Sequence, residues 1–163
     1  MRRLGTLILL GALTVALLPA APALAKEPMQ AETEHTLDIT NTIVDGYLLA
    51  WVGTIDGDIE GCIEWWIELD TWTNITRPDS RAQASHYTMR TLIYDECGGT
   101  LILETLERGT TTMANSPSWR ANGVVTYADE ALFPGWEGRR VHERGHFSVD
   151  VFPWEGTSTF RLN

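Results

Sequence analysis

The stretch GTIDGDIEGCIEWWIELD (53–70) decides the fold, because its polar and apolar residues alternate with a period of two. Successive side chains of a β-strand point to opposite faces, so this period predicts extended structure. The odd positions are mostly aliphatic and the even positions are mostly carboxylates. Gly57 and Gly61 interrupt the alternation and indicate bends of the kind found at barrel corners. We expect a long barrel strand that bends at the glycines and has one acidic face.

Two segments match the residue pattern of a metal site, but the residues around them do not fit such a site. Asp56, Asp58 and Glu60 match the first half of a calcium loop, but the twelfth position, which needs a bidentate Glu, is Ile67. A looser cation site on these acids is the alternative to a solvated acidic face. HERGH (142–146) matches a zinc-protease motif that requires a helix, yet its surroundings alternate as in a strand, where the two histidines would be about 13 Å apart. The sequence therefore predicts no metal site and no cofactor.

The rest of the chain repeats this rhythm. Short runs rich in β-branched and aromatic residues are separated by Gly, Pro, Asn and Asp, without a convincing helix. They fall near 35–43, 46–56, 58–70, 84–95, 99–109, 119–129, 138–152 and 157–162. The predicted fold class is all-β, an eight-stranded antiparallel β-barrel preceded by a signal peptide.

The N-terminus carries an export signal. Two arginines, an apolar run and the small residues before Lys26 predict a signal peptide over 1–25, followed by a flexible arm over 26–34 and the barrel over 35–163. The alternative, a membrane anchor, needs about 20 apolar residues, and this run is shorter and interrupted by prolines. We expect a secreted or periplasmic protein that has no contact with the membrane after cleavage.

The net charge of the chain limits the expected binding partners, and the two cysteines indicate the expected compartment. Without residues 1–25 the chain has 12 − 2 = 10 basic and 22 acidic residues, a formal charge of −12. This acidity argues against nucleic acid as a partner. Cys62 and Cys97 are the two cysteines. In an exported protein they predict a disulfide, with two buried thiols as the alternative.

Five residues are candidates for a site inside the barrel. In a strand, alternate residues share a face, so Glu143 lies on the same face as Val141 and Phe147. Arg139 lies on this face as well. A carboxylate on an apolar face has a raised pKa, so Glu143 is a candidate general acid/base, with Arg139 stabilising negative charge. The alternative is a structural Glu–Arg pair. The candidate ligand contacts are the aromatic residues Tyr87, Trp119 and Tyr127.

The segments GTIDGDIEG (53–61), WRANGVVTYA (119–128) and GWEGRRVHERG (135–145) resemble the small barrels of allene oxide cyclases and dirigent proteins. The resemblance implies an eight-stranded barrel with a cavity, lipocalin-like in outline, whose relatives act on small hydrophobic molecules without a cofactor and can form homo-oligomers. Three functions follow as expectations: binding of a small apolar or amphipathic molecule, a cofactor-independent cyclase or isomerase, or a structural barrel with a filled core. Whether the protein is an enzyme is left open.

Overall fold

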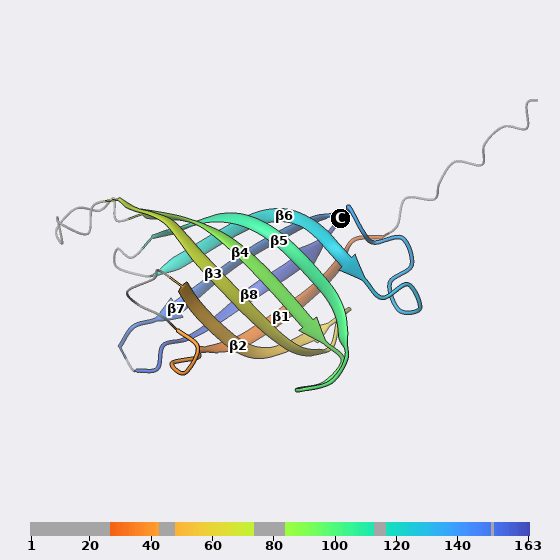
Figure 1. Ribbon diagram of the computed structural model, residues 1–163, viewed down its shortest axis with the longest axis horizontal. Helices are drawn as coiled ribbons and strands as arrows, with labels where there is room; N and C mark the ends of the chain where they lie inside the picture. The colour runs from red at the N-terminus through yellow and green to blue at the C-terminus, as the bar shows by residue number, and fades with distance from the viewer. Residues whose placement is uncertain (1–26, 43–47, 74–83, 113–116, 151) are drawn as a thin grey trace, which may run out of the picture.

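Eight strands form a closed antiparallel barrel in the computed structural model, which describes residues 27–42, 48–73, 84–112, 117–150 and 152–163. Each strand pairs with the next in the sequence, and β8 returns to pair with β1 (Figure 1). The predicted all-β, eight-stranded antiparallel barrel is confirmed. The predicted signal peptide lies outside the described residues, and within them no helix is long and apolar enough to cross a membrane. The strands are β1 (Met29–Leu37), β2 (Leu48–Gly57), β3 (Gly61–Thr73), β4 (Ala84–Tyr94), β5 (Leu101–Thr112), β6 (Ser118–Ala128), β7 (Arg140–Ser148) and β8 (Glu155–Leu162).

The barrel begins earlier than the sequence predicted. Most of the segment 26–34, predicted as an arm, belongs to β1, which pairs with β2 on one side and β8 on the other. The segment looked polar because its inward-facing residues are small. Ala31 and Thr33 are buried, while Glu32 and Glu34 between them are exposed. Small inward residues therefore concealed a strand that closes the barrel.

The stretch 53–70 is a hairpin and not the one long strand predicted, because the chain reverses between Gly57 and Gly61. Both glycines have positive φ, 135° and 148°, which side chains rarely adopt. A Cβ at position 61 would also overlap the carbonyl oxygen of Tyr94. The two bend points predicted from the sequence thus mark the end of one strand and the start of the next. Ile59, at the tip of the hairpin, is 2% exposed.

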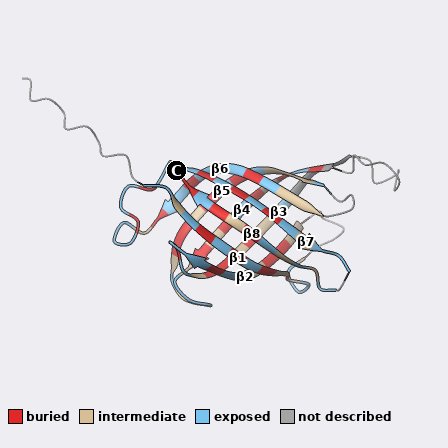
Figure 2. Cartoon of the chain, turned by 180° about the vertical axis from the view of Figure 1, so that it is seen from behind, coloured by how far each residue is buried: buried red, intermediate tan, exposed pale blue. Residues whose placement is uncertain are grey.

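Apolar side chains fill one half of the barrel. We call the end of the barrel that Ile59, Phe133 and Trp136 close the plug end; all three are buried. Next to these three residues, inward-facing side chains from all eight strands form the core, and buried and exposed residues alternate along much of the sheet (Figure 2). The fully buried members of this half include Ile63, Ile93, Leu103, Val141, Phe160 and Leu162. This half of the interior is a packed core.

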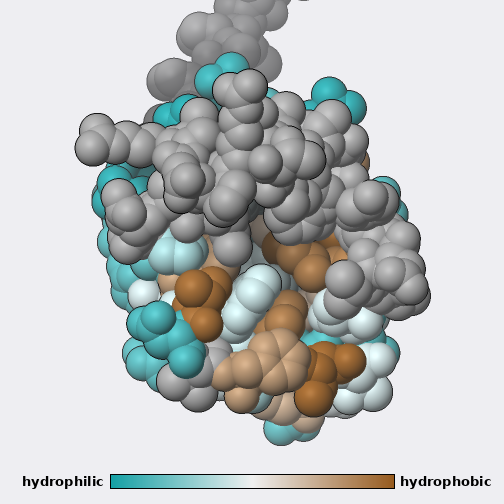
Figure 3. All heavy atoms as spheres, turned by 90° about the vertical axis from the view of Figure 1, so that its left-hand side faces the viewer, coloured by the Kyte–Doolittle hydropathy of each residue, from teal (hydrophilic) through white to brown (hydrophobic). Residues whose placement is uncertain are grey.

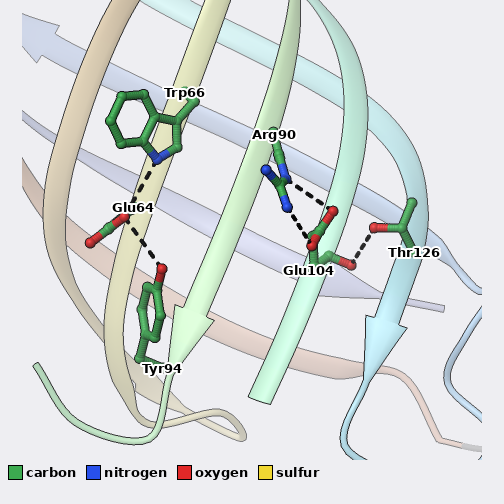
Figure 4. Close-up of polar contacts among 6 residues, drawn as sticks. All are labelled: Glu64, Trp66, Arg90, Tyr94, Glu104 and Thr126. Atoms are coloured by element: carbon green, nitrogen blue, oxygen red, sulfur yellow. Dashed lines mark hydrogen bonds and ion pairs between the residues drawn. The ribbon is translucent and has the colours of Figure 1, made fainter. Parts of the chain in front are cut away.

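Cross-links on the outer surface hold neighbouring strands together. The predicted disulfide is confirmed: Cys62 at the start of β3 joins Cys97, in the turn after β4, with their Cα atoms 5.1 Å apart. On the outer face Arg90 forms an ion pair of 2.9 Å with Glu104 across β4 and β5 (Figure 4). Glu64 accepts a hydrogen bond from Tyr94 across β3 and β4 in the same way.

Candidate functional site

A cavity occupies the half of the barrel opposite the plug end. It has a volume of about 60 Å³, and we call it the chamber. Its walls are mainly aromatic and aliphatic, and apolar side chains are visible at this end of the molecule (Figure 3). The polar members are His35, Ser85, Tyr87 and Thr111. The chamber is therefore an apolar site with few polar groups, which is the usual composition of a small-molecule site.

Glycines on neighbouring strands make room for the rings of the chamber. A Cβ at Gly109 would overlap the ring of Tyr87, which is 2% exposed. A Cβ at Gly156 would overlap Nε2 of His35. The imidazole of His35 contacts the rings of Trp51 and Trp65, with centroids 5.2 and 4.8 Å apart. Close backbone approach at these glycines thus permits aromatic side chains to cross the barrel.

Below the chamber lies a buried polar layer built around Glu143. This residue on β7 is 2% exposed. Trp65 donates its indole N–H to both carboxylate oxygens, at 3.2 and 3.1 Å, and Ser158 donates its hydroxyl to Oε1 at 2.9 Å. These bonds favour the carboxylate, but burial raises the pKa of Glu143 well above its usual value, and the charge of Glu107 raises it further. The side chain is therefore a buried proton acceptor of high basicity.

A chain of hydrogen bonds connects Glu143 to the chamber. The Oγ of Ser158 lies 2.6 Å from Oγ1 of Thr33, which lies 3.3 Å from Nδ1 of His35. All of these side chains are buried. When Glu143 is ionised, the bonds run from Nδ1–H of His35 through the two hydroxyls to the carboxylate. When Glu143 is protonated, all of them can reverse, and Nδ1 becomes an acceptor. We call this chain the relay.

His35 is the end of the relay that lines the chamber. Burial lowers the pKa of His35 to about 4, so its imidazole is neutral at physiological pH. Among the described residues Nε2 has no hydrogen-bond partner. That nitrogen is therefore available to a molecule in the chamber.

A second carboxyl group lies in the polar layer. Glu107 on β5 is 1% exposed, and its Oε1 accepts hydrogen bonds from Thr91 at 3.0 Å and Thr105 at 2.6 Å. Its Oε2 has no partner among the described residues. Burial raises the pKa of Glu107 to about 7. Because Glu107 and Glu143 repel each other when both are charged, ionising both is more costly than ionising one.

The structure separates the predicted pair of Glu143 and Arg139. Glu143 faces the interior, as the period of two predicted. Arg139 precedes the first residue of β7, and its guanidinium lies over the ring of Trp136, 5.8 Å from the centroid. The alternation does not extend into this loop, where the backbone N–H of Arg139 bonds to the carbonyl of Trp136. The predicted pairing of these two residues is therefore wrong.

Two of the three predicted ligand contacts line the chamber. Tyr87 and Trp119 both do so. Tyr127 is 38% exposed and does not. The reason is a bulge in β6: Glu104 and Thr105 pair with Tyr127 and Val125, so Thr126 is left between them. An extra residue shifts the register of the strand, and this one places Tyr127 on the outer face.

The motifs that resembled metal sites belong to the outer surface. HERGH lies within β7, and His142 and His146 are exposed while Glu143 between them is buried. Asp56 is exposed near the end of β2, and Asp58 accepts a hydrogen bond from the backbone N–H of Gln30. In the part of the chain that the structure describes, no three His, Cys, Asp or Glu side chains converge on a point that could hold a metal ion.

The fold and the interior define the class as an antiparallel up-and-down β-barrel with a chamber above a polar layer. No protein-family model, curated protein or solved structure matches the chain significantly. The disulfide is compatible with an oxidising compartment such as the periplasm or the extracellular space. The chamber and the polar layer are therefore the features that indicate the function.

Proposed function

We propose that the protein binds the apolar end of a small apolar or amphipathic molecule in its chamber. The observation that carries this proposal is a cavity walled by indole, phenol and aliphatic groups at one end of an otherwise packed barrel. Native interiors are close-packed, and voids larger than a water molecule are few. Because the plug end is tightly packed, poor filling of the interior does not explain the chamber, and a ligand does.

The size of the chamber limits what enters it. A cavity of about 150 Å³ holds a benzene molecule, and the chamber has about 60 Å³. The walls therefore admit a methyl group or a short alkyl segment, with the remainder of the ligand outside. Trp119 and Phe147 are only partly buried, so rotation of either ring would enlarge the space. The closed eight-stranded barrel is also the fold implied by the resemblance to allene oxide cyclases and dirigent proteins, which supports a ligand-binding interior.

A series of n-alkanols tests this proposal by calorimetry. Each added methylene that enters the chamber is worth about 0.8 kcal/mol, so affinity should rise about fourfold per carbon and then reach a plateau when the chamber is full. Ser85→Leu fills the chamber and should abolish the rise, whereas His86→Leu, the next residue on the same strand but exposed on the outer face, should retain it.

Trp119→Ala provides the opposite change. It enlarges the chamber, so the plateau should move to longer alkanols even if Ser85→Leu fails to fold. An affinity that does not depend on alkanol length, or that rises equally in Ser85→Leu and wild type, would contradict binding in the chamber.

A second candidate function is acid–base catalysis without a cofactor, as in an isomerase or cyclase. The relay favours it. Nε2 of His35 takes a proton from the ligand, Nδ1–H passes its proton to Thr33, and Thr33 and Ser158 pass protons on until the Glu143 carboxylate is protonated. The reverse sequence returns a proton to a different atom of the ligand. His35 thus contacts the reacting molecule, Glu143 stores the proton, and Arg139 has no part.

The ¹⁵N chemical shifts of the His35 ring test the relay without a known substrate. Ser158→Ala breaks the connection to Glu143 and should shift the tautomer balance of His35, whereas Ser85→Ala, which also lines the chamber but lies outside the relay, should not. Identical His35 shifts in wild type and Ser158→Ala would exclude proton transfer along this path and leave ligand binding as the function.

A further inference from the structure

Four arginines form a cationic stripe on the outer face of the barrel, away from the chamber. Strands β5, β6, β7 and β8 are neighbours in the barrel (Figure 1). Each carries one of these arginines, and all four are exposed: Arg108, Arg120, Arg144 and Arg161. They line an open groove of about 830 Å³. We call these four residues and this groove the arginine groove.

The strand register places the four charges close together. Arg120 lies directly opposite Arg144, and residues in such positions have Cβ atoms about 5 Å apart. Arg108 pairs with Asn122, two residues from Arg120, and Arg161 pairs with His142, two residues from Arg144. Each flanking arginine is thus a diagonal neighbour of a central one, at about 7–8 Å. Three strand spacings of about 4.8 Å make the stripe about 14 Å wide.

No ion pair with these four arginines is found in the described part of the chain. Like charges directly opposite each other destabilise a sheet, and Arg120 and Arg144 are such a pair. The one ion pair among the described residues is Arg90–Glu104. The only side-chain carboxylate among the residues that line the groove is Glu143, which is buried on the inner face. Asn163 also lines the groove, and its main-chain carboxylate forms no ion pair with these arginines.

The cluster is notable in a chain with 22 acidic and 12 basic residues. Although acidic residues are abundant in the chain, none occupies the outer-face positions next to Arg120 and Arg144. These positions are Thr110, Asn122, His142 and Thr159. Asn122 contacts His142 by a hydrogen bond, so these two add polar groups without adding negative charge. The nearest acid on β1, Glu32, accepts hydrogen bonds from Thr159 and Gln30. A surface that keeps repelling cations unpaired is arranged for an external anion.

We infer that the arginine groove binds a compact ligand that carries two or more phosphate or sulfate groups. Guanidinium groups bind such oxyanions through paired, charge-assisted hydrogen bonds. Four cations spread over about 14 Å require more than one anionic group, and the groove has the volume of a small-molecule site. The acidity of the rest of the chain repels long polyanions, so the ligand is compact.

Calorimetric titration with inorganic tripolyphosphate tests the inference, with orthophosphate and a sulfated disaccharide as the other arms. Tripolyphosphate should bind at least tenfold more tightly than orthophosphate, and the affinity should fall with added salt. Arg120→Gln/Arg144→Gln should weaken binding by at least about tenfold, since hydrogen bonds between charged groups are strong. Arg139→Gln removes one positive charge outside the groove, where the guanidinium lies over Trp136, and should change binding less than twofold.

Comparing the three titrations distinguishes a phosphorylated ligand from a sulfated one. Tighter binding of the sulfated disaccharide than of tripolyphosphate, lost in the double variant, identifies a sulfated ligand and supports the inference equally. Arg144→Gln alone should leave the unfolding midpoint unchanged or raise it, because it relieves repulsion. Equal affinity for tripolyphosphate and orthophosphate, or equal binding by the double variant and Arg139→Gln, would overturn the inference.

Discussion

Replacing Glu107 by glutamine tests the energetics of the polar layer. Burial raises the pKa of Glu107 from 4.5 to about 7. A carboxyl group whose pKa is higher in the folded protein contributes stability below its unfolded pKa and loses it as pH rises through the folded value. Since one pKa unit corresponds to about 1.4 kcal/mol, ionisation of Glu107 costs the folded protein about 3 kcal/mol between pH 4.5 and pH 8.

The pH dependence of the unfolding free energy of the wild type alone would not isolate the contribution of Glu107. Glu143 has a raised pKa and acts in the same direction, whereas the pKa of His35 is lowered to about 4, so that its contribution grows as pH rises from 4 to 6.5. The difference between Glu107→Gln and wild type removes most of both contributions. The amide has an N–H at the position where Oε2 lacks a partner, so the variant can be less stable at pH 5 by about 1–3 kcal/mol. The pH dependence of the difference is therefore the diagnostic quantity.

The assay is urea unfolding at pH 5 and pH 8 with the disulfide intact. Relative to wild type, Glu107→Gln should gain about 2.5 kcal/mol of unfolding free energy between the two pH values, because a small part of the cost is already present at pH 5. Glu34→Gln removes an exposed carboxylate from the outer face of β1 and should show no such gain. The same free-energy difference between Glu107→Gln and wild type at both pH values would refute the argument that this carboxyl group is buried and titrates near pH 7.

Three further predictions concern the barrel itself. Reduction of the Cys62–Cys97 disulfide opens a loop of 35 residues and should lower the unfolding free energy by about 3–4 kcal/mol, measured by urea unfolding with and without reductant. Gly109→Ala forces a methyl group against Tyr87 and should cost about 1–3 kcal/mol, seen as a lower thermal midpoint than wild type; an unchanged midpoint would contradict the close approach of these residues. Ile59→Ala removes part of the plug and should cost about 2–5 kcal/mol, so an effect below that of a surface substitution would show that the hairpin tip is not buried.

Local periodicity predicted much of the fold because it depends only on neighbouring residues. The strand ranges and the inward face of β3 follow from alternation, and so does the burial of Glu143, which sits between two exposed residues in β7. Glu107 was missed because LILETLERG (101–109) places apolar residues on both faces, and its phase cannot be assigned from the pattern. Such ambiguity is resolved only by pairing with β4 and β6.

The site depended on contacts that no local pattern contains. Ser158 and Thr33 lie 125 residues apart in the chain, and barrel closure through β1 and β8 brings them together. His35 is the first residue of the predicted barrel, and no sequence pattern identified it as a site residue. The bulge that places Tyr127 on the outer face is visible only in the pairing of β5 with β6. The arginine groove likewise arises from cross-strand register, because its four members are widely separated in the sequence.

Xenon binding tests the central claim, that the barrel interior contains an apolar chamber of about 60 Å³ opposite the plug end. Dry apolar cavities take up xenon. In crystals of the protein pressurised with the gas, we expect one xenon atom in the chamber beside Trp51, Trp65 and Tyr87, and none in Ser85→Leu. A chamber without xenon, or one occupied by the side chains that now line it, would contradict the account.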